Sequence, residues 1–189
     1  MHKLTNDRMK WGVMALLAGM LLGGNVLPGA RPWSYWAAKN RGKNADLRRA
    51  VLVSAPLAKA DLFGANLAGA DLRGANLSQA SLEGVNLAGA DLRGADLSQA
   101  YLDGANLAGS DLGGANLTRA IMGAAELQGA SLYHTDLRGA NLEGADLRGV
   151  NLSMVLGLKN AYLEGAHYDE LTDWPDDFEP VKHGASLDK

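Results

Sequence analysis

Residues 65–84 read ANLAGADLRGANLSQASLEG, and residues 85–104 read VNLAGADLRGADLSQAYLDG. The two stretches are identical at sixteen of twenty positions, and within each a five-residue unit, A-[D/N]-L-x-x, repeats four times. A five-residue period inside a twenty-residue period predicts coils of four short sides, stacked as a solenoid.

The unit continues without a gap from residue 45 to residue 154, which is 110 residues or twenty-two units. The central position is Leu throughout, with Met122 as the exception. The first units are irregular, with Val51 and Pro56 in the D/N position. More than half of the 24 glycines of the chain follow this spacing, which is typical of a repeat architecture and not of a disordered chain.

Neither a helix nor a long strand explains this pattern. A helix needs apolar residues at i, i+3, i+4 and i+7, and a long strand needs strict alternation. Here the alternation lasts for one Ala-x-Leu and then breaks, often at a glycine such as Gly64 or Gly84. We therefore expect very short extended segments joined by tight corners, where glycine adopts the required backbone angles at little steric cost.

The A-[D/N]-L-x-x run resembles the pentapeptide-repeat proteins over about three-fifths of the chain. The resemblance implies an all-β solenoid, a right-handed quadrilateral β-helix in which the central Leu and the preceding Ala point inward. Residues one coil apart then stack at about 4.8 Å, the ordinary spacing of strands. One expected interior ladder consists of Leu62, Leu82, Leu102, Met122 and Leu142.

Outward positions also recur every twenty residues, so each side of the solenoid can be read as a column. The Asn/Ala face is small, flat and neutral, and we take it as the candidate docking face: Asn66, Ala68, Asn86, Ala88, Asn106 and Ala108. The Asp/Arg face carries a candidate acidic column, Asp71, Asp91 and Asp111, with Arg73 and Arg93 beside it. A Ser/Thr face carries Ser78, Ser98 and Thr118, and an acidic-aromatic face carries Phe63, Glu83, Tyr101, Asp103, Ile121 and Glu143.

Asp and Asn in the repeated D/N position have a structural interpretation, because their side chains can hydrogen-bond the local backbone at corners. The alternative is functional: an acidic column that resembles a phosphate backbone, as in family members that mimic DNA and bind gyrase. Arg73 and Arg93 offset the charge of the Asp column, which favours the structural interpretation.

The chain before the repeats has a different character. Residues 1–59 carry ten Lys/Arg and two Asp/Glu, whereas residues 60–154 carry five and eleven. Residues 11–30 contain no charge, and a helix of that length spans roughly 30 Å, the thickness of a bilayer core. We expect a membrane anchor there, with a cleaved signal peptide or a soluble apolar helix as the alternatives. The charges on both sides of this segment leave its orientation undecided.

The sequence thus divides into four parts: a membrane anchor or signal-like segment at 1–30, a basic linker or N-terminal cap at 31–44, the repeats at 45–154, and a C-terminal cap with an acidic tail at 155–189. Residues 157–166 are expected to shift the register by one residue. The last part resembles the family's Y-x3-T-x-W/F-P-x2-F-x-P ending through Tyr168, Thr172, Trp174, Pro175, Phe178 and Pro180. Aromatic rings and prolines can cover exposed backbone and stop further stacking.

The sequence contains no pattern that is typical of a catalytic, metal-binding or cofactor-binding site. There is no cysteine, the four histidines lack metal-ligand spacing, and no phosphate-binding or nucleophile motif is present. We therefore expect no enzyme activity, no catalytic residue, no cofactor and no metal. We also expect no direct nucleic-acid binding, because the repeats carry no basic patch.

The leading hypothesis is a non-enzymatic interaction or scaffolding solenoid with an unknown protein partner. It is expected to be tethered to a membrane or exported to a periplasm or equivalent lumen through residues 11–30. The alternatives are a cytosolic DNA mimic that binds gyrase and a structural spacer in a membrane complex. Oligomerisation is left open.

Overall fold

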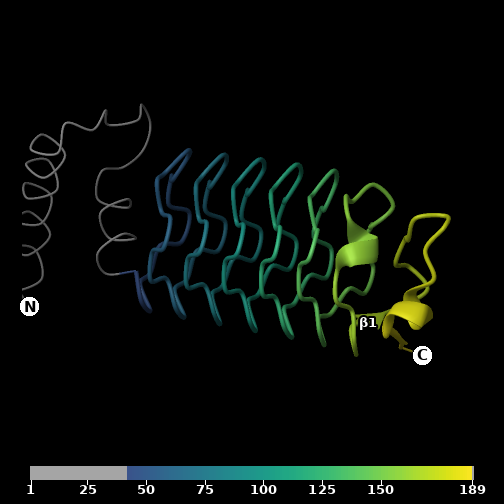
Figure 1. Ribbon diagram of the computed structural model, residues 1–189. Helices are drawn as coiled ribbons and strands as arrows, with labels where there is room; N and C mark the ends of the chain where they lie inside the picture. The colour runs from purple at the N-terminus through teal and green to yellow at the C-terminus, as the bar shows by residue number, and fades with distance from the viewer. Residues whose placement is uncertain (1–41, 189) are drawn as a thin grey trace, which may run out of the picture.

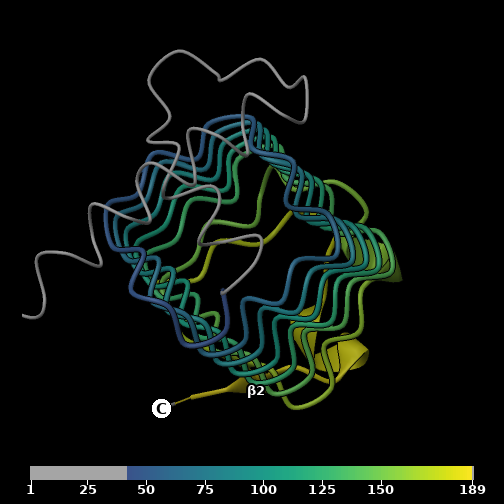
Figure 2. The ribbon, with the colours of Figure 1, turned by 90° about the vertical axis from the view of Figure 1, so that its left-hand side faces the viewer.

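A computed structural model describes residues 42–188, and within this range the chain forms a rod of stacked coils (Figure 1). Seen along the rod axis, each coil has four sides, and equivalent sides of successive coils superimpose (Figure 2). The architecture is the right-handed quadrilateral β-helix. The number of sides follows from the pairing, because parallel bridges join residues twenty apart, from Asp46 with Asn66 to Asp136 with Leu156.

Each side of a coil is shorter than an ordinary β-strand. In the regular coils a single residue per side, the one in the D/N position, forms the bridge to the next coil. The amide of the following Leu donates to the bridging residue one coil on, as Leu87 does to the carbonyl of Asn106 at 2.7 Å. The backbone polar groups of the sides are therefore satisfied between coils, although no side forms a long strand.

The corners are β-turns that begin at the central Leu. The amide three residues later donates back to that Leu, as Ala90 does to Leu87 at 2.9 Å. The second central residue of the turn has a positive φ, which is 64° at Gly89. Nine residues other than glycine also adopt this conformation: Asn44, Arg49, Ser54, Lys59, Gln79, Gln99, Arg119, Ala124 and His134.

The core runs along the rod axis and consists of the central Leu residues and the small residues two positions before them. The residues of the expected interior ladder, Leu62, Leu82, Leu102, Met122 and Leu142, are all buried. Two polar residues replace Ala inside the rod. The Thr135 hydroxyl donates to the carbonyl of Leu112 at 2.7 Å, whereas the Ser110 hydroxyl has no hydrogen-bond partner among residues 42–188.

The ladder between coils is interrupted at one place among the described residues. The amides of Gly129, Leu132, His134 and Asn151 make no short, well-aligned backbone hydrogen bond, although equivalent amides elsewhere bond the neighbouring coil at 2.6–3.1 Å. We call this place the seam. It lies where the coil of Ser131 meets the coil of Asn151, and the bridge between these two residues persists.

The stacking register changes after residue 156, as the sequence predicts. The bridges Asn141–Tyr162 and Asp146–His167 join residues twenty-one apart, and Asn151–Asp173 joins residues twenty-two apart. The first inserted residue is accommodated at η1, the 3-10 helix Leu158–Asn160. Gly157 precedes this helix with a φ of 74°, and Leu158 keeps its side chain in the core.

The final segment folds back on the last coils. Strand β1 (His167–Tyr168) pairs in parallel with β2 (Ser186–Leu187), and the 3-10 helix η2 (Pro180–His183) lies between them in sequence. Tyr168 and Phe178 are buried in the core cluster, and Trp174 packs against it. The rings form a continuous series, with Trp174 edge-on to Tyr168 and stacked on Phe178, which in turn stacks on His183.

The anchor or signal-like segment at 1–30 and most of the basic linker at 31–44 lie outside the described residues. The N-terminal hydrophobic helix therefore stays a prediction. Between residues 42 and 188, no helix has the length and apolar character needed to cross a bilayer.

Candidate interaction surfaces

The D/N positions that define the faces are built into the corners. On each face an Asp or Asn side chain accepts a hydrogen bond from the amide two residues later, for example Asn86 from Ala88 at 3.0 Å and Asp96 from Ser98 at 3.0 Å. The sequence predicts that these short side chains accept hydrogen bonds from the local backbone at the corners, and these contacts confirm it. The D/N side chains are therefore structural first, whatever a partner does with them.

The Asn/Ala face is fixed by these turns. Asn66, Asn86 and Asn106 bridge one another in a row, and each side chain holds the amide of the Ala two residues later at 3.0–3.2 Å. All six candidate docking residues are half-buried, and Gly69, Gly89 and Gly109 lie exposed beside them. The result is a neutral surface of short, ordered side chains over three coils.

The Asp/Arg face is a ladder of alternating charge. Arg73 contacts Asp71 of its own corner at 2.7 Å and Asp91 of the next coil at 3.6 Å. Arg93 repeats the arrangement with Asp91 at 2.5 Å and Asp111 at 3.5 Å. The hydrogen bonds from Arg73 and Arg93 lower the pKa values of Asp71 and Asp91 respectively, so both carboxylates are charged at neutral pH.

This pairing determines how much unneutralised negative charge the acidic column presents. A surface that imitates a phosphate backbone needs a series of unneutralised negative charges. Here two guanidinium groups stand within ion-pair distance of all three carboxylates. The candidate acidic column is thus largely neutralised by its own face.

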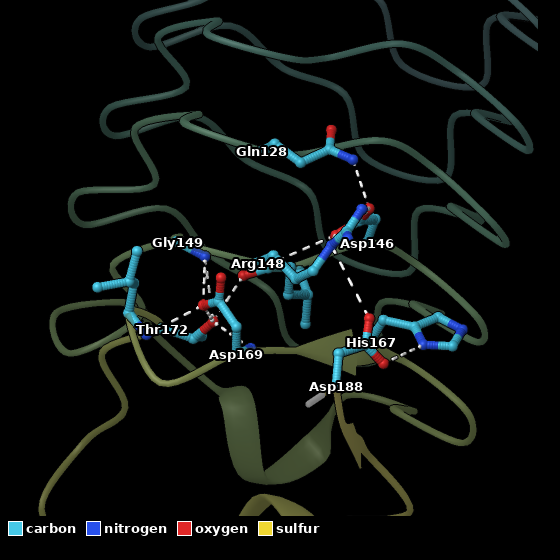
Figure 3. A network of polar contacts seen from close by, with 10 residues as sticks. Gln128, Asp146, Arg148, Gly149, His167, Asp169, Thr172 and Asp188 are labelled. Carbon is cyan, nitrogen blue, oxygen red and sulfur yellow. Dashed lines mark hydrogen bonds and ion pairs between the residues drawn. The ribbon is translucent and has the colours of Figure 1, made fainter.

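A polar network that the sequence did not predict ties the C-terminal segment to the rod (Figure 3). Arg148 donates from Nε to Asp146 at 2.9 Å and approaches Asp188 at 3.9 Å. Asp188 also lies 3.0 Å from His167 Nδ1, and Gln128 from the preceding coil bonds Asp146. The shifted register brings Asp146 and His167 together, and Asp188 reaches them because β2 folds back along β1, a return that no local sequence signal reveals.

A second part of this network replaces missing backbone bonds. The Gly149 amide, which lies next to the seam, donates to side chains of the C-terminal segment in place of a backbone carbonyl: to Asp169 at 2.9 Å and to Thr172 Oγ1 at 3.2 Å. Thr172 in turn donates to the carbonyl of Leu147 at 3.0 Å. Burial raises the pKa of Asp169, but hydrogen bonds led by that of Gly149 outweigh it and lower the pKa. These contacts hold the C-terminal segment in place.

The described residues contain no arrangement that indicates catalysis. Between residues 42 and 188, no three His, Asp or Glu side chains are grouped closely enough to hold a metal ion. His134 lies exposed at a corner against Tyr133, and His183 stacks on Phe178. The regular corners consist of two residues each, so they present side chains without forming a loop over them.

The fold and its faces define a class, the solenoid repeat proteins whose working parts are extended surfaces. The model of the family described as pentapeptide repeats matches eight copies over residues 43–79, 60–99, 80–119 and 125–155. The chain belongs to the pentapeptide repeat family. Proteins of this family are generally structural or interaction proteins and not enzymes.

Solved structures of the same family resemble this chain. Rfr23 from the cyanobacterium Cyanothece 51142 shares 38% identity over 55% of this chain and 63% of its own, with a TM-score of 0.47. A protein of the Arabidopsis thaliana thylakoid lumen shares 30% identity over 59% of this chain and 75% of its own, with a TM-score of 0.52. QnrB1, a plasmid-mediated fluoroquinolone resistance protein, shares 17% identity over 73% of this chain and 89% of its own, with a TM-score of 0.38. The chain thus spans less than two thirds of the length of Rfr23.

Among curated protein sequences, none matches this chain significantly.

Proposed function

We propose that this chain is a non-enzymatic interaction scaffold that docks a protein partner on its Asn/Ala face. The observation that carries the proposal is the row of Asn66, Asn86 and Asn106 with Ala68, Ala88 and Ala108, which is neutral, flat and free of long side chains. A partner can approach the backbone of the rod closely there, since nothing longer than Asn projects from three consecutive coils.

Docking on this face orders few side chains, so it loses little conformational entropy. Binding loses free energy when long side chains must be ordered, at about 0.5–1.5 kcal/mol for each. The Asn side chains of this face are already held by their own turns at 3.0–3.2 Å, and the Ala residues have no rotamers to lose. Such a surface is preorganised for a complementary partner.

Site-specific photo-crosslinking in the native cell tests the docking face. A photoreactive residue at Ala88 should give a discrete adduct with a partner, and the same residue at Ser98, on the opposite face and also half-buried, should not. The adduct should disappear when Ala68 and Ala108 are both changed to Arg. Equal crosslinking from Ala88 and Ser98 would show that the Asn/Ala face is not the docking surface.

We further propose that residues 11–30 tether the scaffold to a membrane or direct its export. Their lack of charge over twenty residues and their basic flanks support this. The relative from the Arabidopsis thylakoid lumen supports export into a compartment bounded by a membrane. Fractionation of cells that express the intact chain should recover it with membranes or an exported fraction, whereas recovery wholly in the soluble cytosol contradicts the proposal.

Gyrase binding requires a cytosolic protein with an unneutralised acidic surface. The ion pairs of Arg73 and Arg93 remove most of that charge from the Asp column, and this gives gyrase binding less support than scaffolding. A supercoiling assay with the purified chain separates the two, because inhibition at a small protein excess favours the DNA mimic.

A further inference from the structure

The acidic-aromatic face carries exposed apolar side chains on an otherwise polar rod. Phe63 and Tyr101 are each 45% exposed, and Ile121 is half-buried and forms a bridge with Tyr101. Side chains this exposed leave much of their apolar surface uncovered by the rod, so that surface adds little to its stability. They are available to a ligand.

The carboxylates beside these apolar residues differ from those of the Asp/Arg face. Glu83, Asp103 and Glu143 have no ion-pair partner among residues 42–188, whereas Asp71 and Asp91 are each paired with an arginine. Glu83 accepts a hydrogen bond from the Ser81 hydroxyl, which leaves its charge uncompensated. The unneutralised acidic charge of the coils is therefore concentrated around the apolar column.

Gly123 makes a gap in the outer column of this face, between Asp103 and Glu143. A Cβ at this position would stand 2.7 Å from Asp103 Oδ1 and 3.8 Å from the carbonyl oxygen of Glu143. The Asp103 carboxylate leans over the gap because no side chain occupies it. A cationic side chain placed here would meet the Asp103 carboxylate and the Glu143 carbonyl together.

One cation already rests on this face. Lys43 Nζ lies 5.1 Å from the centroid of the Phe63 ring, within the range of a cation–π contact. Lys43 and Phe63 are one coil apart, so a cation on this face can lie over an aromatic ring of the neighbouring coil. This contact is independent of the carboxylates and indicates the same kind of ligand.

We propose that the acidic-aromatic face docks an extended, lysine- and arginine-rich segment of a partner protein. Asp103 and Glu143 are two coils apart, or about 10 Å at the ordinary strand spacing. An extended peptide advances roughly 10 Å in three residues. The face therefore matches cations at every third residue, with Tyr101 and Ile121 covering the stems of their side chains. This surface is distinct from the Asn/Ala face, and the inference does not depend on docking there.

Binding of a dye-labelled peptide, Arg-Ser-Ser-Arg-Ser-Ser-Arg, to the full chain in zwitterionic detergent tests this proposal by fluorescence anisotropy. Combining Glu83→Gln, Asp103→Asn and Glu143→Gln should weaken binding about tenfold, since exposed ion pairs contribute about twofold each. The matched control combines Glu126→Gln, Glu170→Gln and Asp176→Asn, which removes the same charge elsewhere and should leave the dissociation constant unchanged. Circular dichroism shows whether both variants keep the fold.

Three results would overturn the proposal. The first is no measurable binding of the peptide to the wild-type chain. The second is an equal loss in both triple variants, which indicates nonspecific attraction to net charge. The third concerns the source of the ligand. Changing Arg31, Lys39 and Arg41 to Gln could strengthen peptide binding to the chain with the wild-type face and leave binding to the Glu83/Asp103/Glu143 variant unchanged. That result would show that the face binds the chain's own basic stretch instead of a partner. Photo-crosslinking at Ala88 is unaffected by any of these outcomes.

Discussion

At the scale of single residues, each position of the five-residue unit has one physical task. The central Leu fills the core, the small residue before it lets the coil close, the Asp or Asn fixes the corner, and the last residue takes a positive φ. The one remaining position, directly after the central Leu, points outward and carries the variation. This division predicts which substitutions the rod tolerates.

A lysine at an inward position should destabilise the rod far more than a lysine at an outward position. Leu92 is fully buried, so Leu92→Lys places a charge in an apolar core and should cost about 4 kcal/mol or more in unfolding free energy. Ala88 lies half-buried on the Asn/Ala face, and Ala88→Lys should change stability by about 0.5 kcal/mol or less. Urea denaturation measures both, and equal damage would contradict the inward and outward assignment.

Substitutions at the last position of the unit, which has a positive φ, should change stability in opposite directions at two sites on one face. Ala124 has a φ of 51°, a conformation that costs an L-residue about 1–2 kcal/mol. Ala124→Gly should therefore stabilise the rod by about 0.5–1 kcal/mol, after the greater flexibility of glycine in the unfolded chain is deducted. One coil earlier, Gly104 has a φ of 62° and open space around its missing Cβ, so Gly104→Ala should destabilise by about 1 kcal/mol through the backbone alone. Opposite signs in the urea midpoints are the expected result.

At the scale of elements, a side of the rod acts as a column of stacked residues, and columns differ in how well they are held. The Asp/Arg face is held by ion pairs within and between coils. The seam is the opposite case, because four amides there make no short, well-aligned hydrogen bond to the neighbouring coil. Two predictions follow at this scale.

The stability of the rod should depend on pH because of the Asp–Arg pairs at its corners. Hydrogen bonds from arginine lower the folded-state pKa values of Asp71, Asp91, Asp136 and Asp146 below the unfolded value of about 3.9. The unfolded chain then binds protons first, so the stabilisation is fully present above about pH 4 and is lost as pH falls through the lowered pKa values. The urea midpoint should fall steeply below about pH 4. Arg73→Gln with Arg93→Gln should make that fall shallower, whereas Arg119→Gln, a residue with no ion pair among the described residues, should not.

Hydrogen exchange should locate the seam. The amides of Leu132, His134 and Asn151 should exchange roughly tenfold or more faster than those of Leu112 and Gly114, which bond to the next coil at 2.8 Å. All five amides lie on one side of the rod, so differences in face do not explain the contrast. Uniform protection along this column would show that the coils are closed there.

At the scale of the whole molecule, each coil contacts only its neighbours, so the ends decide how the rod unfolds. Phe178 is buried in the C-terminal segment between Trp174 and His183. Phe178→Ala should cost about 3 kcal/mol locally. It should also raise hydrogen exchange in the coils after residue 130 while leaving that of residues 65–104 unchanged. An equal rise along the whole rod would indicate that the molecule unfolds in a single step.

The sequence determined the four-sided coil, its inward residues and its corners. It could do so because every contact that builds them recurs at a fixed spacing of five or twenty residues, as Leu82, Gly84 and Asn86 illustrate. The shift of one residue at 157–166 was also predicted, since the repeat visibly breaks there.

The sequence indicated that Arg73 and Arg93 offset the Asp column, but only the tertiary structure decided how these arginines reach it and what holds the C-terminal end. Arg73 reaches both its own corner and the next coil, while Asp103 lies against Gly123 with no ion-pair partner among residues 42–188. The contact of His167 with Asp188 depends on a shifted register and on β2 returning to the rod. His167 and Asp188 are twenty-one residues apart, which is not a multiple of the repeat, so the repeating pattern carries no information about their contact.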